Sequence, residues 1–409
     1  KWSLQQAVVS APNVPSWSIG QASLSMRQNP QQQIEGGDGY IDHIDLASLA
    51  AWKDWLPDPW SATWDQAAPQ GQLKQLKWQY VGGLADLKVQ SWQAQAVNLG
   101  WQPASSTKSK PLATWPGVTG LSAQFEGTGR QFKGVVDWQS GELNWPGLWA
   151  EPRQNIDLFQ SDFSVVLGDE GARVEVKSAQ LRSQQARVDF RLVWNNTQTA
   201  PLGHLDLQAD MAFAPVGQVL RWLPTPLPES VRQYLKLALP QGEVRQTHAR
   251  VLGRLDDFPF KKPGMGEFHI STQLAKVRYV TVPKAMLESP GSGEWPTLQD
   301  LSGDLVFDRM SVRLSKVKAR VAQAPGIVWP VLEAQIKNLE QANVELRAEG
   351  KGPLGEALTL WKSMPLNDMT DRVLNGARAQ GLAEYKMNLS IPVENTEQTQ
   401  AKGNVLMLG

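Results

Sequence analysis

Cysteine is absent from the 409 residues, and neither sign of charge is in excess. Without cysteine the chain has no disulfide, no thiolate nucleophile and no Cys-ligated zinc, which is compatible with an oxidising compartment. Lys and Arg together number 40, as do Asp and Glu, so the formal net charge is zero. The basic excess that suits a protein to a nucleic-acid backbone is missing, and we expect no nucleic-acid partner.

Long apolar runs and a signal peptide are also missing. A membrane-spanning helix needs about 18 consecutive apolar residues, whereas the dense run at 327–332 is short and contains Pro330. The chain opens at Lys1 in sequence that has the pattern of folded protein rather than of a leader. We therefore expect a piece of a longer protein.

Motifs for catalysis or metal binding are not found. The four histidines are too far apart for metal-ligand spacing: His43, His204, His248 and His269. The glycines at 127, 129 and 134 predict a hairpin, because the Lys-Ser/Thr ending of a phosphate loop is missing. Asp256 and Asp257 would point to opposite faces of a strand, which gives no support to a glycosidase pair. We predict no catalytic residues, no metal and no cofactor, and hence no enzyme.

Tryptophan is unusually frequent, with 18 residues against five tyrosines. Four tryptophans precede proline, at 115, 145, 295 and 329. Proline pushes the residue before it toward extended geometry, so these pairs suit the entry or edge of a strand. The tryptophans are expected to anchor a large β core; the alternative is that several line an apolar or sugar-binding groove.

Alternation of apolar and polar residues with period two predicts β-strands over much of the chain. The clearest case is residues 204–213, and shorter alternations lie at 174–176, 188–192, 312–314, 317–321, 344–346 and 387–391. Turn signals lie between them at 141, 168–171, 195–196 and 303–304. The pattern is typical of an antiparallel sheet with one wet face.

Amphipathic stretches predict a few short helices, which would cover the sheet or its ends. They lie at 216–223, 228–239, 354–361 and 366–373, and a further one follows Asp45 and carries Leu46, Leu49 and Leu56. Polar or Gly-rich stretches at 29–39, 103–111 and 287–296 are candidate boundaries. We divide the chain into a first β segment at 1–215, a helical insertion at 216–242 and a second β segment at 243–409, with a helical stretch near 354–376.

A succession of short elements carries a family resemblance. It runs through PESVRQYLKLAL at 228–239, VLGRLDDFPF at 251–260, WPTLQDLSG at 295–303 and GKGPL at 350–354, preceded by IDLASLA at 44–50 and PGVTGL at 116–121. In order and spacing they resemble the YhdP branch of the AsmA-like envelope proteins, relatives of TamB. The resemblance covers most of residues 40–395.

The resemblance implies a fold, a location in the cell and a function. Such proteins are anchored in the inner membrane of Gram-negative bacteria by an N-terminal helix, which we expect to lie outside this piece, and extend across the periplasm. Their body is an elongated, curved antiparallel sheet, a repeating β-groove with an apolar concave face. They are implicated in moving phospholipid toward the outer membrane. The expected partners are phospholipid and the inner membrane, with outer-membrane or periplasmic envelope proteins as further candidates.

A groove of this kind would lower the cost of moving a lipid through water without catalysing any reaction. A diacyl lipid has about 30 methylenes, each costing about 0.8 kcal/mol to expose, so passage through water meets about 24 kcal/mol. That barrier corresponds to a rate on the order of 1e-5 per second. Alternating strands supply an apolar face, although the same alternation would equally build a closed sandwich core. The resemblance favours the open groove.

We predict a mainly β, non-enzymatic lipid-conduit segment of the cell envelope. Apolar side chains chosen by alternation are expected to contact acyl chains: Val188, Phe190, Leu192, Leu205, Leu207, Met211 and Phe213. A slip of one residue in register would reverse every face. The rival interpretations are a structural envelope scaffold with closed β cores that binds protein partners, and a carbohydrate-binding β domain that uses surface tryptophans.

Overall fold

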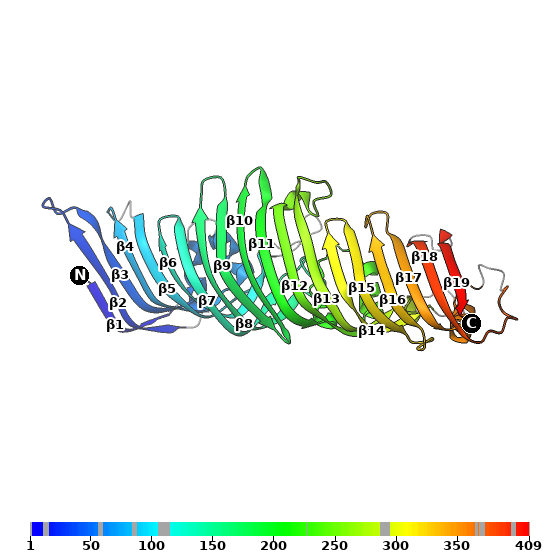
Figure 1. Ribbon diagram of the computed structural model, residues 1–409. Coiled ribbons are helices and arrows are strands. Elements are labelled where there is room, and N and C mark those ends of the chain that lie inside the picture. The colour runs from blue at the N-terminus through cyan, green and yellow to red at the C-terminus, as the bar shows by residue number, and fades with distance from the viewer. Residues whose placement is uncertain are drawn as a thin grey trace. The chain divides into compact units, whose positions relative to one another are not determined.

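The described part of the chain is one open, antiparallel sheet of 19 strands with a few short helices (Figure 1). The computed structural model describes residues 2–10, 16–55, 60–83, 88–104, 115–225, 227–286, 295–364, 367, 373–393 and 398–408. The predicted mainly β fold class is therefore confirmed. Contacts divide the chain into two units, and the boundary falls within β11 (Ala200–Pro215), between Leu205 and Asp206.

Unit 1 contains residues 1–205 and the short segment 224–226. Its first ten strands pair antiparallel in chain order, from β1 with β2 to β9 with β10. These strands are β1 (Trp2–Val9), β2 (Trp17–Gln28), β3 (Ile34–Asp45), β4 (Gln70–Val81), β5 (Lys88–Trp101), β6 (Gly117–Thr128), β7 (Gln131–Asn144), β8 (Arg153–Leu167), β9 (Ala172–Ser183) and β10 (Ala186–Thr197). A 3-10 helix, η1 (Ala47–Trp55), and a short helix, α1 (Trp60–Ala67), connect β3 to β4.

Unit 2 contains residues 206–223 and 227–409. After β11 come the helices α2 (Val216–Arg221) and α3 (Glu229–Ala238), and then eight strands that pair antiparallel in chain order. These strands are β12 (Gln241–Arg254), β13 (Gly266–Val280), β14 (Thr297–Asp308), β15 (Ser311–Val321), β16 (Val328–Ile336), β17 (Asn343–Pro353), β18 (Leu382–Pro392) and β19 (Gln400–Leu408). Short helices η2 (Leu255–Asp257) and η3 (Lys284–Met286) follow β12 and β13, and α4 (Leu354–Ser363) follows β17.

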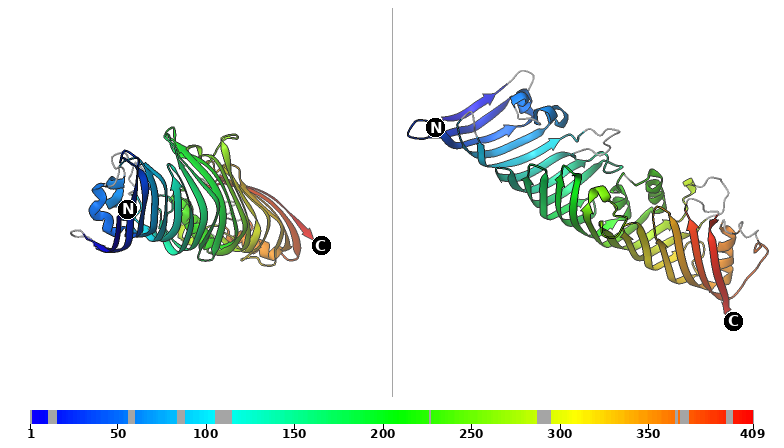
Figure 2. Two further views of the ribbon diagram at one scale, coloured as in Figure 1. Left: turned by 90° about the vertical axis from the view of Figure 1, so that its left-hand side faces the viewer. Right: turned by 90° about the horizontal axis from the view of Figure 1, so that it is seen from above.

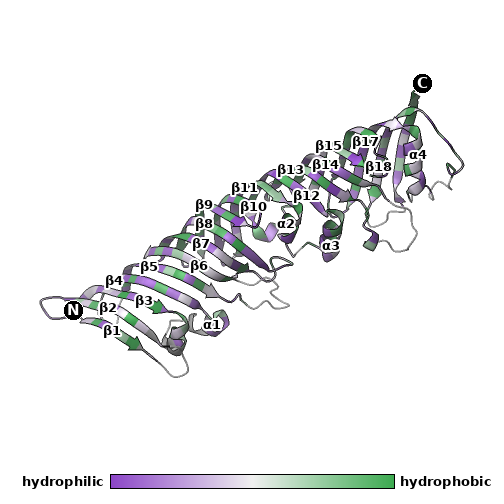
Figure 3. Ribbon diagram, turned by 90° about the horizontal axis from the view of Figure 1, so that it is seen from below, coloured by the Kyte–Doolittle hydropathy of each residue, from purple (hydrophilic) through white to green (hydrophobic). Residues whose placement is uncertain are grey.

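The two ends of the strands carry different connections. Every described α-helix follows an odd-numbered strand: β3, β11 or β17. Because successive antiparallel strands reverse direction, the helices of one unit gather at one end of its sheet, as Figure 3 shows for α2, α3 and α4. The other end carries hairpins, some of only two residues, such as the turn between β6 and β7. None of the helices in the described ranges is long and apolar enough to cross a membrane.

The predicted helices are mostly confirmed. The structure has α2, α3 and α4 where the apolar spacing placed them. After Asp45, whose carboxylate accepts hydrogen bonds from the backbone and hydroxyl of Ser48, the chain forms the 3-10 helix η1 rather than an α-helix. Leu56 lies outside the described residues, as do Leu366 and Met369 of the last predicted helix, while Val373 lies in a turn. The division into segments 1–215, 216–242 and 243–409 stays a prediction.

Three of the predicted turns are wrong, because they lie inside strands. Gly141 lies in β7, Asn195-Asn196 in β10 and Gly303-Asp304 in β14. Gly141 is small for a packing reason: a Cβ there would lie 2.0 Å from Nε1 of Trp138. The Asn196 side chain accepts the backbone N–H of Ala172 (2.8 Å) instead of forming a turn. The strands are consequently longer than the turn signals indicated.

β-Bulges bend the strands of both units, whose curvature is visible in Figures 1 and 2. In unit 2, four polar residues with φ between 48° and 53° lie at register shifts in successive strands: Gln246, Lys276, Asp300 and Lys316. Lys276, Asp300 and Lys316 are each followed by a fully buried apolar residue, such as Val277 after Lys276. A bulge adds one residue, so the strand turns and its alternation resumes out of phase. The 312–314 and 317–321 alternations are therefore two halves of β15, joined at Lys316.

The positive φ at these bulges predicts an asymmetric response to substitution. Lys276→Val is expected to lower the free energy of unfolding by about 1–2 kcal/mol, because a β-branched residue is strained in the left-handed region. Lys276→Gly is expected to change it by less than about 0.5 kcal/mol, since glycine adopts this φ freely. Chemical denaturation followed by circular dichroism measures both variants. Equal losses would show that the backbone conformation is not the cause.

Candidate functional site

One face of the sheet in unit 1 is apolar across successive strands. Residues directly opposite each other on paired strands share a face, and we call such a set a rung. Phe163 of β8 lies opposite Gly134 of β7 and Val176 of β9, and the rung continues to Leu192 of β10. Three further rungs, read from β5 to β10, extend the same face: Trp92, Gly127, Phe132, Val165, Val174 and Trp194; Ala96, Ala123, Val136, Ser161, Ala179 and Phe190; and, from β7, Trp138, Phe159, Leu181 and Val188. Together these residues form the apolar face of unit 1.

Aromatic rings cover much of this face. Ring centroids of 6.0–6.4 Å link Phe163 with Phe125 and Phe132, and Phe159 with Trp138 and Phe190. Such edge-on and offset contacts are worth about 0.5–1.5 kcal/mol each beyond the area they bury. The alternations chosen from the sequence do not include these phenylalanines of β6 to β8; in β8, serine interrupts the apolar series at 161. The face is consequently more aromatic than the candidates chosen from the sequence.

Several tryptophans form pairs in which an indole lies over a glycine. Trp78 covers Gly39 and Trp92 covers Gly127, each directly opposite on the next strand. A Cβ at either glycine would lie 2.0–2.6 Å from the indole ring. Trp194 covers Gly203 in the same way, and its Nε1 donates to the carbonyl of Leu202 (2.9 Å). Large rings thus fill the space that glycine leaves, as in aromatic rescue of glycine in designed sheets.

The bend of unit 1 encloses a small core. Its buried members come from β5 to β8: Ala96, Leu99, Val118, Ala123, Val136, Trp138 and Ile156. Val118 and Ala123 belong to one strand, β6, and meet in this core because the strand is bent between them at a register shift. Trp138 is only 4% exposed, and its Nε1 donates to the carbonyl of Thr119 (2.9 Å). The predicted role of tryptophan as a core anchor is met here.

The seven predicted groove residues lie on the apolar side of the strands. Val188, Phe190 and Leu192 of β10 occupy the rungs described above. In β11, Asp206 pairs with Arg250 and Asp210 with His248, residues that alternate with the apolar Ala249 and Val251 of β12. Those ion pairs place Asp206 and Asp210 on the charged side. Period-two geometry then places the remaining four on the opposite side: Leu205, Leu207, Met211 and Phe213.

Unit 2 has an apolar face of its own, built from aliphatic side chains. One rung crosses seven strands, from β13 to β19: Thr272, Leu305, Leu314, Ala334, Leu346, Leu389 and Ala401. A parallel rung runs from β13 to β18: Ile270, Phe307, Val312, Ile336, Val344 and Ile391. Thr272 is the polar exception, and its hydroxyl is satisfied by Thr247 (2.7 Å) and the carbonyl of Arg245 (3.2 Å).

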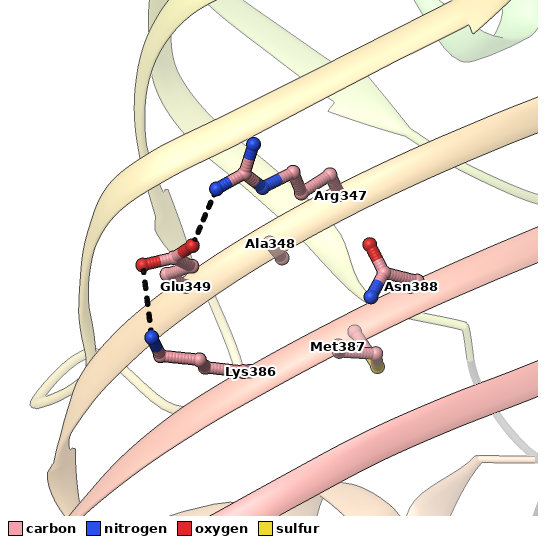
Figure 4. Close-up of a pocket in the computed structure, with 6 residues that line it drawn as sticks. All are labelled: Arg347, Ala348, Glu349, Lys386, Met387 and Asn388. Atoms are coloured by element: carbon pink, nitrogen blue, oxygen red, sulfur yellow. Dashed lines mark hydrogen bonds and ion pairs between the residues drawn. The ribbon is translucent and has the colours of Figure 1, made fainter.

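The opposite face is charged and solvated. A shallow pocket between β17 and β18 shows its character (Figure 4), since Glu349 accepts a hydrogen bond from Arg347 (2.8 Å) and lies 3.9 Å from Lys386. The hydrogen bond from Arg347, assisted by the charge of Lys386, lowers the pKa of Glu349. These groups neutralise one another, and Asn388 beside them adds an exposed amide. Within the described ranges, no cluster of three or more His, Asp or Glu side chains is arranged to hold a metal.

The apolar face has little protein over it. All nineteen strands belong to one sheet, so no second sheet of the described residues packs on it as in a sandwich. Its rung residues away from the bends are mostly half-buried, among them Phe163, Val176 and Leu192. In unit 2, residues of α4 pack against strand residues of this face. The arrangement can hold apolar chains along the strands' concave side.

The fold and this face define the class: an open antiparallel β-groove with an apolar lining. A family model described as YhdP protein matches residues 12–407, so the chain belongs to the YhdP family of envelope proteins. The resemblance drawn from the sequence is thereby confirmed. No curated protein and no solved structure matches the chain.

Proposed function

We propose that this chain is a non-enzymatic segment of a periplasmic lipid conduit. The apolar face would shield phospholipid acyl chains between the inner and outer membranes, while headgroups stay in solvent. In the full-length protein an inner-membrane anchor would hold the segment in place. The observation that carries the proposal is the uncovered apolar face, which continues rung after rung within each unit.

Energetics support a conduit over a scaffold. Apolar surface left in water costs about 25 cal/mol per Å², and a monomeric protein rarely leaves a long apolar strip uncovered. Acyl chains would remove that surface from water and would themselves avoid the cost of about 0.8 kcal/mol per methylene. A scaffold with closed β cores would instead need a second layer on the face.

Photocrosslinking in cells tests the proposal, with a probe placed at one position at a time in the full-length protein. We expect phospholipid adducts at Phe163 and Val176, which lie on the apolar face, and none at the neighbours Asp162 and Glu175, which point to the other face. Adducts at none of the four, with the protein folded, would mean that a partner covers the face. The scaffold would then be the better account. Adducts at all four would mean non-specific contact.

A further inference from the structure

Helix α4 lies on the apolar face of unit 2 and buries part of it (Figure 3). Leu354, Ala357 and Leu360 of α4 pack in one cluster with residues from β14, β15, β16 and β18 and from the turn before β16: Leu298, Val321, Ala324, Ile327, Trp329, Ala383 and Tyr385. Under the helix, Ala383 and Tyr385 of β18 are 0% and 9% exposed.

The neighbouring strand β19 has no such cover. Met407 and Val405 of β19 lie directly opposite Ala383 and Tyr385, on the same two rungs. They are 74% and 59% exposed. Leu406, which lies between them and points to the opposite face, is 61% exposed, so β19 is open on both faces. Both α4 and the strands on the two sides of β18 therefore contribute to the cover of Ala383 and Tyr385.

Few polar contacts fasten the helix to the sheet. Glu356 in its first turn accepts the backbone N–H of Gly326 (2.8 Å), in the turn before β16. Leu354 donates its N–H to the carbonyl of Gly381 (2.9 Å), and Lys362 donates to the carbonyl of Ala377 (2.8 Å). The last two contacts tie α4 only to the segment that follows it. Burial and the nearby Glu356 carboxylate raise the pKa of Tyr385, as expected for a first turn that lies close above β18.

With α4 packed against the sheet, two hydrogen-bond donors have no acceptor among the described residues. Nε1 of Trp329, beneath the helix, and Nε1 of Trp361, on the helix, are both buried without an acceptor among the described residues. A buried indole N–H that lacks a partner disfavours the arrangement that buries it. Lifting α4 would let water or the polar atoms of a lipid accept from both groups. Among the described residues, the docked helix is thus held by apolar contact and one side-chain hydrogen bond to the turn before β16, while two indole donors lack a partner.

We propose that α4 is a movable lid, which occupies the apolar face at β14 to β18 and is displaced when a phospholipid passes. This inference rests on the proposed lipid-conduit function. It concerns how the apolar face is uncovered at β14 to β18. When no acyl chains are bound there, α4 covers the apolar side chains in their place.

The 409 residues contain no cysteine, so within them a locking reagent would react only at introduced thiols, and any cysteine elsewhere in the full-length protein would first be replaced by serine. In the Gly326→Cys/Glu356→Cys variant of the full-length protein, a reversible bis-methanethiosulfonate reagent would fasten α4 to the turn before β16, since a Cβ at 326 would lie 2.6 Å from the Glu356 carboxylate. Lys351→Cys/Glu384→Cys is the control, because that ion pair (3.4 Å) joins β17 and β18 on the charged face. The readout is the phospholipid adduct of a photocrosslinker at Tyr385, with a second crosslinker at Phe163 in unit 1.

With α4 locked, we expect the adduct at Tyr385 to disappear and to return on reduction, while the control pair and the Phe163 adduct stay unchanged. An adduct at Tyr385 with the lock in place would overturn the lid, and so would an adduct at Phe163 with none at Tyr385 in either state. The conduit would stand in both cases. Adducts at neither position would remove the conduit and the lid with it.

A labelling rate gives a second, independent measurement. In a single Ala357→Cys variant the thiol lies under the helix, and the rate of its reaction with a polar maleimide reports opening. Vesicles of phosphatidylethanolamine and phosphatidylglycerol are expected to raise that rate about tenfold, which corresponds to a shift of about 1.4 kcal/mol in the opening equilibrium. The exposed Thr359→Cys position on the same helix should not respond. An unchanged rate at 357 would make α4 a fixed cap.

Discussion

Replacing Trp138 by alanine is expected to lower the free energy of unfolding of unit 1 by about 3–5 kcal/mol. The side chain is 4% exposed and stands in the core at the bend of β5 to β8. Its loss would leave a cavity beside Gly141, which has no side chain to fill it, and would remove the edge contact with Phe159 (6.4 Å between ring centroids). The carbonyl of Thr119 would lose its indole donor as well.

Denaturant unfolding followed by far-UV circular dichroism measures this effect. Trp2→Ala is the matched control, because Trp2 is 73% exposed on β1 and its removal should cost less than about 0.5 kcal/mol. Trp138→Phe separates the contribution of apolar packing from that of the hydrogen bond, because it keeps most of the apolar contact and loses the indole N–H. We expect a loss of unfolding free energy between those of Trp2→Ala and Trp138→Ala. If Trp138→Ala and Trp2→Ala were equally mild, the core at the bend would not be what stabilises unit 1.

The sequence predicted the type of structure better than its geometry. Period-two alternation identified strands correctly, because each side of an antiparallel sheet sees a different environment along its whole length. It could not identify the bulges: Lys276 and Asp300 look like ordinary exposed strand residues, and the backbone conformation there is set by register with neighbours far away in sequence. The bend that turns an apolar face into a groove depends on those bulges.

Two of the wrongly predicted turns were placed at glycines that lie inside strands. Gly141 and Gly303 resemble turn residues, yet each lies within a strand where a larger neighbour needs the space, Trp138 in one case and Val317 in the other. A propensity scale cannot distinguish a glycine in a turn from a glycine that makes room for a neighbouring side chain, because the scale contains no information on packing between strands. Of the predicted groove residues, Val188, Phe190 and Leu192 lie opposite Leu181, Ala179 and Val176 of β9, with a register shift between the last two pairs, and their contact with lipid stays a prediction.

Introducing a carboxylate on the apolar face is expected to have the largest effect on function. Leu192→Glu places a charge on the rung of Phe163 and Val176, where acyl chains would have to pass. Contact between an ionised group and an apolar chain costs several kcal/mol. A barrier raised by about 4 kcal/mol slows passage on the order of a thousandfold. Since a lipid in a conduit crosses the strands one after another, one such obstacle limits the whole flux.

The measurement is the rate of labelled phospholipid transfer between the two membranes, with the substitution in the full-length protein. Leu192→Met keeps the volume and the apolar character and should transfer lipid at the normal rate. Arg191→Gln changes charge at the next position, which points to the opposite, solvated face, and should also have little effect. A scaffold that only binds partners predicts no difference between the three variants. If Leu192→Glu folds normally and transfers lipid at the normal rate, acyl chains do not travel along this face at β10.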